Sequence, residues 1–317
     1  MTETPALPQI TLGLRSFAAE DPGGWRKMLD FARAADAAGV DRLVVSDHVV
    51  FGEHLEEYAK PETGGIAGGK QPTGPDGHWL EPLTTLSVVA GITSRIRLRT
   101  QIIIAALRRP VVLAKSAATL DVLSGGRLDL GVGVGWQRAE YEAAGLPFDG
   151  RGRLLDHTLD VCQTLWRHVR ASYESPDLKF DAIHQMPKPL QPGGVPIWTS
   201  GTVRNTTARR IARYGARWIP WGRDAANLTE SIPRMKDAVV QEGGAVDGMQ
   251  VVGALPVLRT DAGAMDLPRT MDRLPQLIAG GVTDFIDFSI LPKSYDENLA
   301  ELSTLVAGFR QAVGRKL

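Results

Sequence analysis

The sequence predicts an α/β fold, a closed (β/α)8 TIM barrel, and three observations lead to it. Short apolar runs typical of buried parallel strands alternate with longer amphipathic helical patterns. The alternation repeats eight times, and eight β/α units close naturally into a barrel. The length of 317 residues suits such a barrel as one domain spanning residues 1–317. A doubly wound open sheet is the structural alternative.

The first half of the chain contains four of these units. The strands are expected at 10–14, 42–46, 96–104 and 128–134. The first helix is expected to begin at Asp21-Pro22, an N-cap followed by proline, and to end at Gly39. The next helices are expected to open at Glu81-Pro82 and to cover 111–123 and 152–168. Cys162 falls on the apolar stripe of the last of these, which indicates a core residue.

The second half supplies four more strands, each followed by a helical pattern. They are expected at 196–200, 217–221, 251–258 and 283–289, with a final helix over 298–313. Two stretches interrupt the repeat. Residues 49–80 are rich in glycine and proline and follow the second strand, so their position predicts a lid over the barrel mouth. Residues 171–194 contain four prolines and predict an irregular insertion before the fifth strand.

Composition excludes several classes of function. Lys and Arg together balance Asp and Glu at 36 each, so the excess positive charge of a nucleic-acid binder is missing. No apolar run approaches the roughly 20 residues of a membrane helix, and residues 1–8 do not form a signal peptide. A single cysteine fits a reducing compartment, and we expect a cytoplasmic protein.

Active sites of such barrels lie where strands end, and Asp47 and His48 follow the second strand. A carboxylate beside a histidine can position a cofactor and a proton-transfer group together, because the pKa of histidine suits proton transfer near neutral pH. The alternative is an aspartate that caps the loop and a histidine that packs beneath it.

Glycines alternate at the end of the fourth strand, at Gly131, Gly133 and Gly135. They remove every side chain from one face, so a flat ring or another backbone can approach closely. The alternative is that they relieve crowding inside the barrel. The dinucleotide fingerprint is missing, since Trp136 stands where its last glycine would be.

Ser200, Gly201 and Thr202 end the fifth strand and lead into a helix. Backbone N–H groups at a helix start, helped by hydroxyls, suit a phosphate. Four arginines in or before that helix either meet an anionic cofactor tail or form a solvated face: Arg204, Arg209, Arg210 and Arg213.

The six histidines form no paired metal motif, so we expect no metal site. No strand core contains a lysine that could form a Schiff base, and only Lys293, just after the eighth strand, keeps aldolase chemistry open.

Several segments resemble the luciferase-like flavin and deazaflavin oxidoreductases, especially the actinobacterial coenzyme F420-dependent type. The resemblance covers nearly the whole chain, and its most specific part is the long run from Arg108 to Gly145. The shorter segments that carry it are SDH at 46–48, EPLTTL at 81–86, RIRLRT at 95–100 and VPIWTSG at 195–201.

This resemblance implies a homodimeric barrel that holds the ring of coenzyme F420, or alternatively FMN, at its mouth. It makes Asp47 a ring contact and His48 the proton donor or acceptor. It places a non-prolyl cis peptide at Gln101-Ile102, behind the ring. The further residues that it implies for cofactor binding are Ile104, Val134, Gly135 and Trp136 along the ring, and Ser200, Gly201 and Thr202 at the phosphate.

One residue departs from the family pattern. The F420-dependent sugar-phosphate dehydrogenases carry a glutamate where Trp136 stands, so the second acid/base group of that reaction is missing, and we do not expect sugar-phosphate oxidation. With Phe17, Phe51 and Trp79, Trp136 instead indicates a more apolar substrate pocket.

The expected reaction is hydride transfer between F420 and an organic, fairly apolar small molecule. One alternative is an FMN-dependent monooxygenase that receives reduced flavin from a separate reductase. Another is a relative that binds the cofactor without catalysis, which a Trp136 side chain blocking the ring site would favour.

Overall fold

The barrel is closed in the computed structural model, which describes residues 7–60 and 69–315. Its strands are β1 (Gln9–Gly13), β3 (Arg42–Val45), β5 (Arg97–Thr100) with β6 (Ile103–Ile104), β7 (Leu128–Gly133), β10 (Ile197–Gly201), β11 (Arg217–Pro220), β12 (Gln250–Ala254) and β13 (Asp284–Asp287). Neighbours in this order pair in parallel, and β13 returns to pair with β1. The predicted TIM barrel is confirmed, and the open sheet is excluded.

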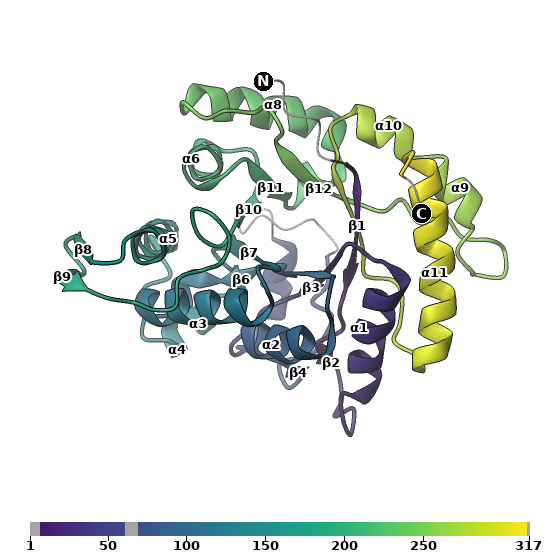
Figure 1. The fold of residues 1–317 in the computed structure, drawn as a ribbon, viewed down its shortest axis with the longest axis horizontal. Helices are drawn as coiled ribbons and strands as arrows, with labels where there is room; N and C mark the ends of the chain where they lie inside the picture. Colours follow the sequence, from purple (N-terminus) through teal and green to yellow (C-terminus); the bar gives the residue numbers. More distant parts are fainter. Residues whose placement is uncertain (1–6, 61–68, 316–317) are drawn as a thin grey trace.

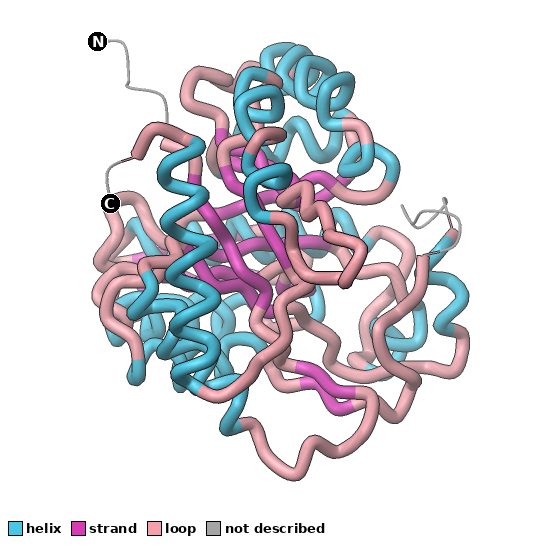
Figure 2. Tube along the Cα trace, turned by 90° about the vertical axis from the view of Figure 1, so that its right-hand side faces the viewer, coloured by secondary structure: helices cyan, strands magenta, loops and turns pink. Residues whose placement is uncertain are grey.

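Helices surround the strands (Figure 1). They are α1 (Arg26–Ala38), α2 (Pro82–Ile92), α3 (Pro110–Leu123), α4 (Arg138–Ala143), α5 (Arg151–Arg167), α6 (Asn205–Tyr214), α7 (Arg223–Ala226), α8 (Leu228–Gln241), α9 (Leu267–Met271), α10 (Leu274–Ala279) and α11 (Tyr295–Ala312). Figure 2 shows the strands enclosed by this helical layer. Cys162 on α5 is fully buried, as predicted.

Two helix starts differ from their predictions. The start at Asp21-Pro22 is wrong, because Gly23 and Gly24 have φ of 64° and 146°, and α1 begins only at Arg26. Asp21 instead accepts a hydrogen bond from the Gly23 N–H at 2.9 Å. The last helix begins at Tyr295, earlier than expected, because Ser294 and Glu297 form a capping box.

The third strand is divided in two. The peptide bond between Gln101 and Ile102 is cis, which the family resemblance implied, and it separates β5 from β6. The predicted continuous strand over 96–104 is therefore wrong in its middle. The side chain of Ile102 faces Gly133 on the neighbouring strand.

The insertion at 171–194 is less irregular than expected. Strands β8 (Ala171–Glu174) and β9 (Lys179–Ile183) form an antiparallel hairpin outside the barrel. A cis bond precedes Pro187. Short strands with one exposed face carry weak alternation, which explains why the pattern did not reveal them.

The lid residues 49–60 and 69–80 are fixed to the barrel at both ends. The Val49 N–H donates to Glu140 at 2.6 Å and the Gly52 N–H donates to Gln137 at 3.0 Å. At the other end β4 (His78–Trp79) pairs with β2 (Phe17–Ala18), which follows β1. A short 3-10 helix spans Leu55–Ala59. The lid glycines 64, 65 and 68, like residues 1–6 at the N-terminus, lie outside the described residues.

No helix among the described residues is long and apolar enough to cross a membrane.

Candidate active site

A cavity of about 440 Å³ opens where the strands β1, β3, β6, β7 and β10 end. Its volume lies within the usual range for small-molecule sites. Most predicted site residues line it: Phe17, Asp47, His48, Trp79, Gln101, Ile102, Ile104, Val134, Gly135, Trp136, Ser200 and Gly201. Thr202 and Phe51 are not among the lining residues, although the Phe51 ring packs on His48 with centroids 4.4 Å apart.

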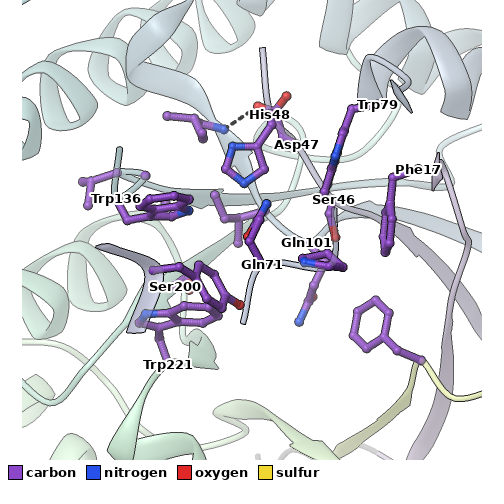
Figure 3. A pocket seen from close by; sticks show the side chains of 18 of the residues that line it. Phe17, Ser46, Asp47, His48, Gln71, Trp79, Gln101, Trp136, Ser200 and Trp221 are labelled. Atoms are coloured by element: carbon purple, nitrogen blue, oxygen red, sulfur yellow. Dashed lines mark hydrogen bonds between the residues drawn. The ribbon is translucent and has the colours of Figure 1, made fainter. Parts of the chain in front are cut away.

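Two aromatic walls face each other across this cavity (Figure 3). On one side Phe17 and Trp79 stack with centroids 4.5 Å apart, and the Trp79 indole N–H donates to Thr73 at 2.8 Å. On the other side Tyr58 packs against both Trp136 and Trp221. A planar ligand between these walls would make stacking contacts on aromatic faces.

His48 lies between the two walls (Figure 3), with its side chain only 8% exposed. Its Nδ1 lies 3.4 Å from Oε2 of Glu140, a side chain that is fully buried. The alignment falls short of a hydrogen bond, and neither atom has another partner in the described part of the chain. The second oxygen of Glu140 accepts from the Val49 N–H, so the carboxylate is held beside the imidazole.

Asp47 is engaged by the protein on both carboxylate oxygens. Oδ2 accepts from the Ile104 N–H at 2.8 Å and from Arg108 Nη1 at 2.6 Å, while Oδ1 accepts from Arg108 Nη2 at 3.0 Å. Burial raises the pKa of Asp47, and the Arg108 guanidinium opposes that rise. Arg108 also bonds Glu81, whose other oxygen caps α2 through the Thr84 N–H. Asp47, which follows β3 and precedes His48, therefore links the end of β3 to the end of β6.

The alternate glycines of β7 accommodate the divided third strand. A Cβ on Gly131 would lie 2.0 Å from the carbonyl oxygen of Thr100, and one on Gly133 would lie 2.9 Å from Ile102. A Cβ on Gly135, whose φ is 67°, would lie 3.1 Å from Ile104. The close approach is therefore made by backbone and isoleucine side chains of the adjacent strand, so the relief of crowding accounts for these glycines.

The arginines after β10 have separate partners. Arg209 pairs with Glu242, Arg210 with Asp156 and Arg213 with Asp160. The Val203 N–H, at the start of this segment, donates to Asp224 at 2.7 Å. Of the residues predicted to bind the phosphate, Ser200 and Gly201 line the cavity.

The sequence analysis missed Arg15, Tyr58 and Gln71, which line the cavity, and Glu140, which lies beside His48. Arg15 directly follows the first predicted strand, at 10–14. The Gln71 Nε2 is buried without a partner and Gln71 lines the cavity, and burial raises the pKa of the Tyr58 hydroxyl. Glu140 also had a usable signal, since it follows Trp136 by four residues inside the family-like run. Tyr58 and Gln71 lie in the lid, where no periodicity reports which side chains face inward.

The sequence also raised the questions of a Schiff-base lysine and of a metal site. Lys293 forms an ion pair with Glu301 at 2.6 Å, and it is not among the residues that line the cavity. Among residues 7–60 and 69–315, no group of three His, Cys, Asp or Glu side chains is arranged to hold a metal ion.

The sequence profile of the luciferase-like monooxygenase family matches residues 10–267. The chain therefore belongs to this family, and the resemblance noted in the sequence is confirmed.

The chain is similar to other known sequences and, in its fold, to solved structures. An uncharacterised protein of Mycobacterium tuberculosis is 30% identical over 282 residues, covering 87% of this chain and 91% of its own. An F420-dependent glucose-6-phosphate dehydrogenase of Kineococcus radiotolerans is 30% identical over 204 residues, 63% of this chain and 53% of its own.

Among solved structures, an F420-dependent secondary alcohol dehydrogenase bound to an F420-acetone adduct has a TM-score of 0.71 at 16% identity, covering 96% and 99% of the two chains. A riboflavin lyase with modified FMN has a TM-score of 0.71 at 15% identity, covering 98% and 96%.

Proposed function

We propose that this protein transfers a hydride between coenzyme F420 and a fairly apolar organic molecule, with His48 as the proton donor or acceptor. The observation that carries the proposal is the position of His48. Its imidazole lies in the wall of an aromatic-lined cavity at the carboxyl ends of the strands, with a buried carboxylate 3.4 Å behind it. Relatives that use F420, among them the Kineococcus dehydrogenase, support the choice of cofactor.

The residues at the cavity fit a planar deazaflavin or flavin ring. Ile102, Ile104 and Val134 offer an apolar surface at the cavity, and Trp136 stands at its edge without filling it. Unpartnered donors on Gln71 and Trp136 could bond ring oxygens, and Ser200 and Gly201 could bond the tail. When bound, the deazaflavin supplies the carbon that gives or accepts the hydride.

The protein's own residues supply position and a proton. The Glu140 carboxylate favours a proton on Nδ1 of His48, which leaves Nε2 to take up or give the proton that accompanies the hydride. The aromatic side chains exclude water and hold the two reacting carbons in proximity. Trp136 provides neither a charge nor an acid, so we do not assign sugar-phosphate oxidation to this chain.

Parallel equilibrium binding of F420 and FMN to the purified protein tests the proposal. We expect tight binding of F420 and quenching of tryptophan fluorescence, because Trp136 lines the cavity. Anaerobic turnover with simple ketones or enones should then change the absorbance of the deazaflavin. Binding of neither cofactor would refute the proposal, and binding without turnover would favour the non-catalytic alternative.

An FMN-dependent monooxygenase is the second candidate, because a riboflavin lyase structure with modified FMN shares this fold. Preference for FMN together with oxygen consumption in the presence of a reductase would establish it.

The homodimer also remains a proposal. Exposed apolar side chains on the adjacent helices α2 and α3 suit a second copy: Val88, Ile92, Val112 and Leu123. Sedimentation velocity would test it, and a monomer at micromolar concentration would contradict it.

A further inference from the structure

A second cavity, of about 530 Å³, adjoins the candidate active site on the side of β11, β12 and β13. The two cavities share Gln101 and Phe288 in their linings. The second is therefore continuous in its walls with the site that holds His48, and none of the predicted cofactor residues except Gln101 lines it.

Apolar side chains make most of its surface. Val252 and Ile286 belong to the apolar cluster inside the barrel, together with Trp198, and their outer ends line the cavity. Ala225 and Ala254 contribute small side chains, which leave the space open. The lining contains no lysine, arginine or histidine, and its one acidic side chain, Asp287, accepts hydrogen bonds from the Ser289 N–H and hydroxyl, so nothing in the lining favours an anion.

Gln101 presents a hydrogen-bond donor at the boundary between the cavities. Its Oε1 accepts from Arg99 Nη2 at 2.8 Å. Arginine can only donate, so the amide orientation is fixed and Nε2 is directed away from Arg99. Arg99 itself is fully buried, bonds Asp284 at 3.0 Å and lies over the Trp198 ring at 4.3 Å, which holds it in place.

We propose that the second cavity binds the apolar body of the substrate, and that Gln101 Nε2 donates to an acceptor oxygen on it. The ligand class is a neutral aromatic or alicyclic carbonyl compound, too large for the first cavity once the cofactor ring occupies it. This inference rests on the proposed function in that it calls the ligand a substrate. The binding itself does not require redox chemistry.

The probe for the test is prodan, a neutral fluorescent naphthyl ketone, and its comparison ligand is 2-dimethylaminonaphthalene, which lacks the carbonyl. Prodan binding is followed by the blue shift of its emission, and binding of the comparison ligand by its displacement of prodan, with the cofactor absent and with the cofactor at saturation. We expect prodan to bind in both cases, because none of the predicted cofactor residues except Gln101 lines the second cavity.

Two variants separate the contributions of shape and hydrogen bonding. Ala254→Phe fills the cavity and should weaken both ligands by about tenfold or more. Gln101→Glu keeps an acceptor for Arg99 and removes the donor, so it should weaken prodan by up to about tenfold and leave the binding of 2-dimethylaminonaphthalene unchanged. Ala300→Phe, on the exposed face of α11, is the matched control and should change neither.

Three results would overturn the proposal. They are no prodan binding to the unmodified protein at millimolar concentration, full displacement of prodan by the cofactor, and equal prodan affinity in Ala254→Phe. Failure of the proposed function is distinguishable, because prodan would then still bind and respond to both variants although neither F420 nor FMN binds.

Discussion

The two ends of this barrel use buried polar groups in opposite ways. Near the strand starts, the buried polar groups are charged side chains that pair with one another: Arg42 and Arg97 bond Asp129, and Arg99 bonds Asp284. Arg99 Nε and Asp284 Oδ1 make no hydrogen bond in the described chain, but both belong to side chains whose charge is paired. At the mouth, the Nε2 of Gln71 and the indole N–H of Trp136 are neutral donors, buried without a hydrogen-bond partner in the described chain. Buried polar groups are normally satisfied, so groups that stay unsatisfied at a cavity indicate where a ligand supplies the missing partners. We therefore expect substitutions at the first end to lower stability and substitutions at the second end to lower ligand binding.

The largest effect is expected at the strand starts, from Asp284→Ala. Arg42 and Arg99 would lose their shared carboxylate while remaining buried, although burial already lowers the pKa of Arg99 to about 10 and it stays charged at pH 7. Breaking such a buried ion pair costs about 3–5 kcal/mol. Urea unfolding measures the loss. A change below about 1 kcal/mol would show that these charges do not hold the barrel together.

At the mouth, His48→Ala should lower catalytic turnover and not the stability of the fold. We expect turnover to fall by roughly 10² or more, equivalent to about 2.7 kcal/mol of transition-state stabilisation, with cofactor affinity kept. Steady-state kinetics and cofactor titration measure the two quantities. Loss of cofactor binding with unchanged activity per bound cofactor would refute the proton-transfer role.

Glu140→Gln sharpens the same comparison. Glutamine can still accept from the Val49 N–H, but it removes the charge beside His48. Turnover should fall by about tenfold, with the unfolding midpoint and the cofactor affinity nearly unchanged. The control is Glu142→Gln, an exposed position on the same helix. Equal loss in both variants would assign the effect to the helix and not to His48.

The smallest effect is expected from Asp36→Asn, on α1. Burial alone would raise the pKa of Asp36, but the N–H groups of Ser94, Ile96 and Arg95 outweigh it and the pKa is lowered. A lowered folded-state pKa gives stability that is complete above the unfolded value near 4 and lost as pH falls through the folded value. The variant should cost about 1 kcal/mol at pH 7. Urea midpoints from pH 7 to pH 3 should converge, and a constant difference would contradict the assignment.

The order of strands and helices follows from the sequence because each unit carries its own period and its own stop signals. What the sequence does not reveal depends on contacts between units. The start of α1 differs from its prediction because Gly23 and Gly24 adopt positive φ. Between β5 and β6, Ile102 packs against Gly133 of another unit.

The candidate site shows the same limit. His48 was found because it follows a strand, whereas Glu140 reaches it from a helix after another strand, across 92 positions of sequence. The role of Asp47 was predicted only in part, since its partner Arg108 lies 61 residues further along the chain, between a 3-10 helix (Ala105–Leu107) and α3. Single-chain patterns locate strand ends, but they do not report which side chains meet there.

The anchoring of the lid has a consequence for how this protein diversifies. Hydrogen bonds to α4 fix its first residues, and the pairing of β4 with β2 fixes its last. The segment between can be replaced as a cassette, because doubling the length of a closed loop costs only about 0.6 kcal/mol. We therefore expect that exchange of residues 53–77 among relatives changes ligand selectivity and leaves the barrel and His48 in place.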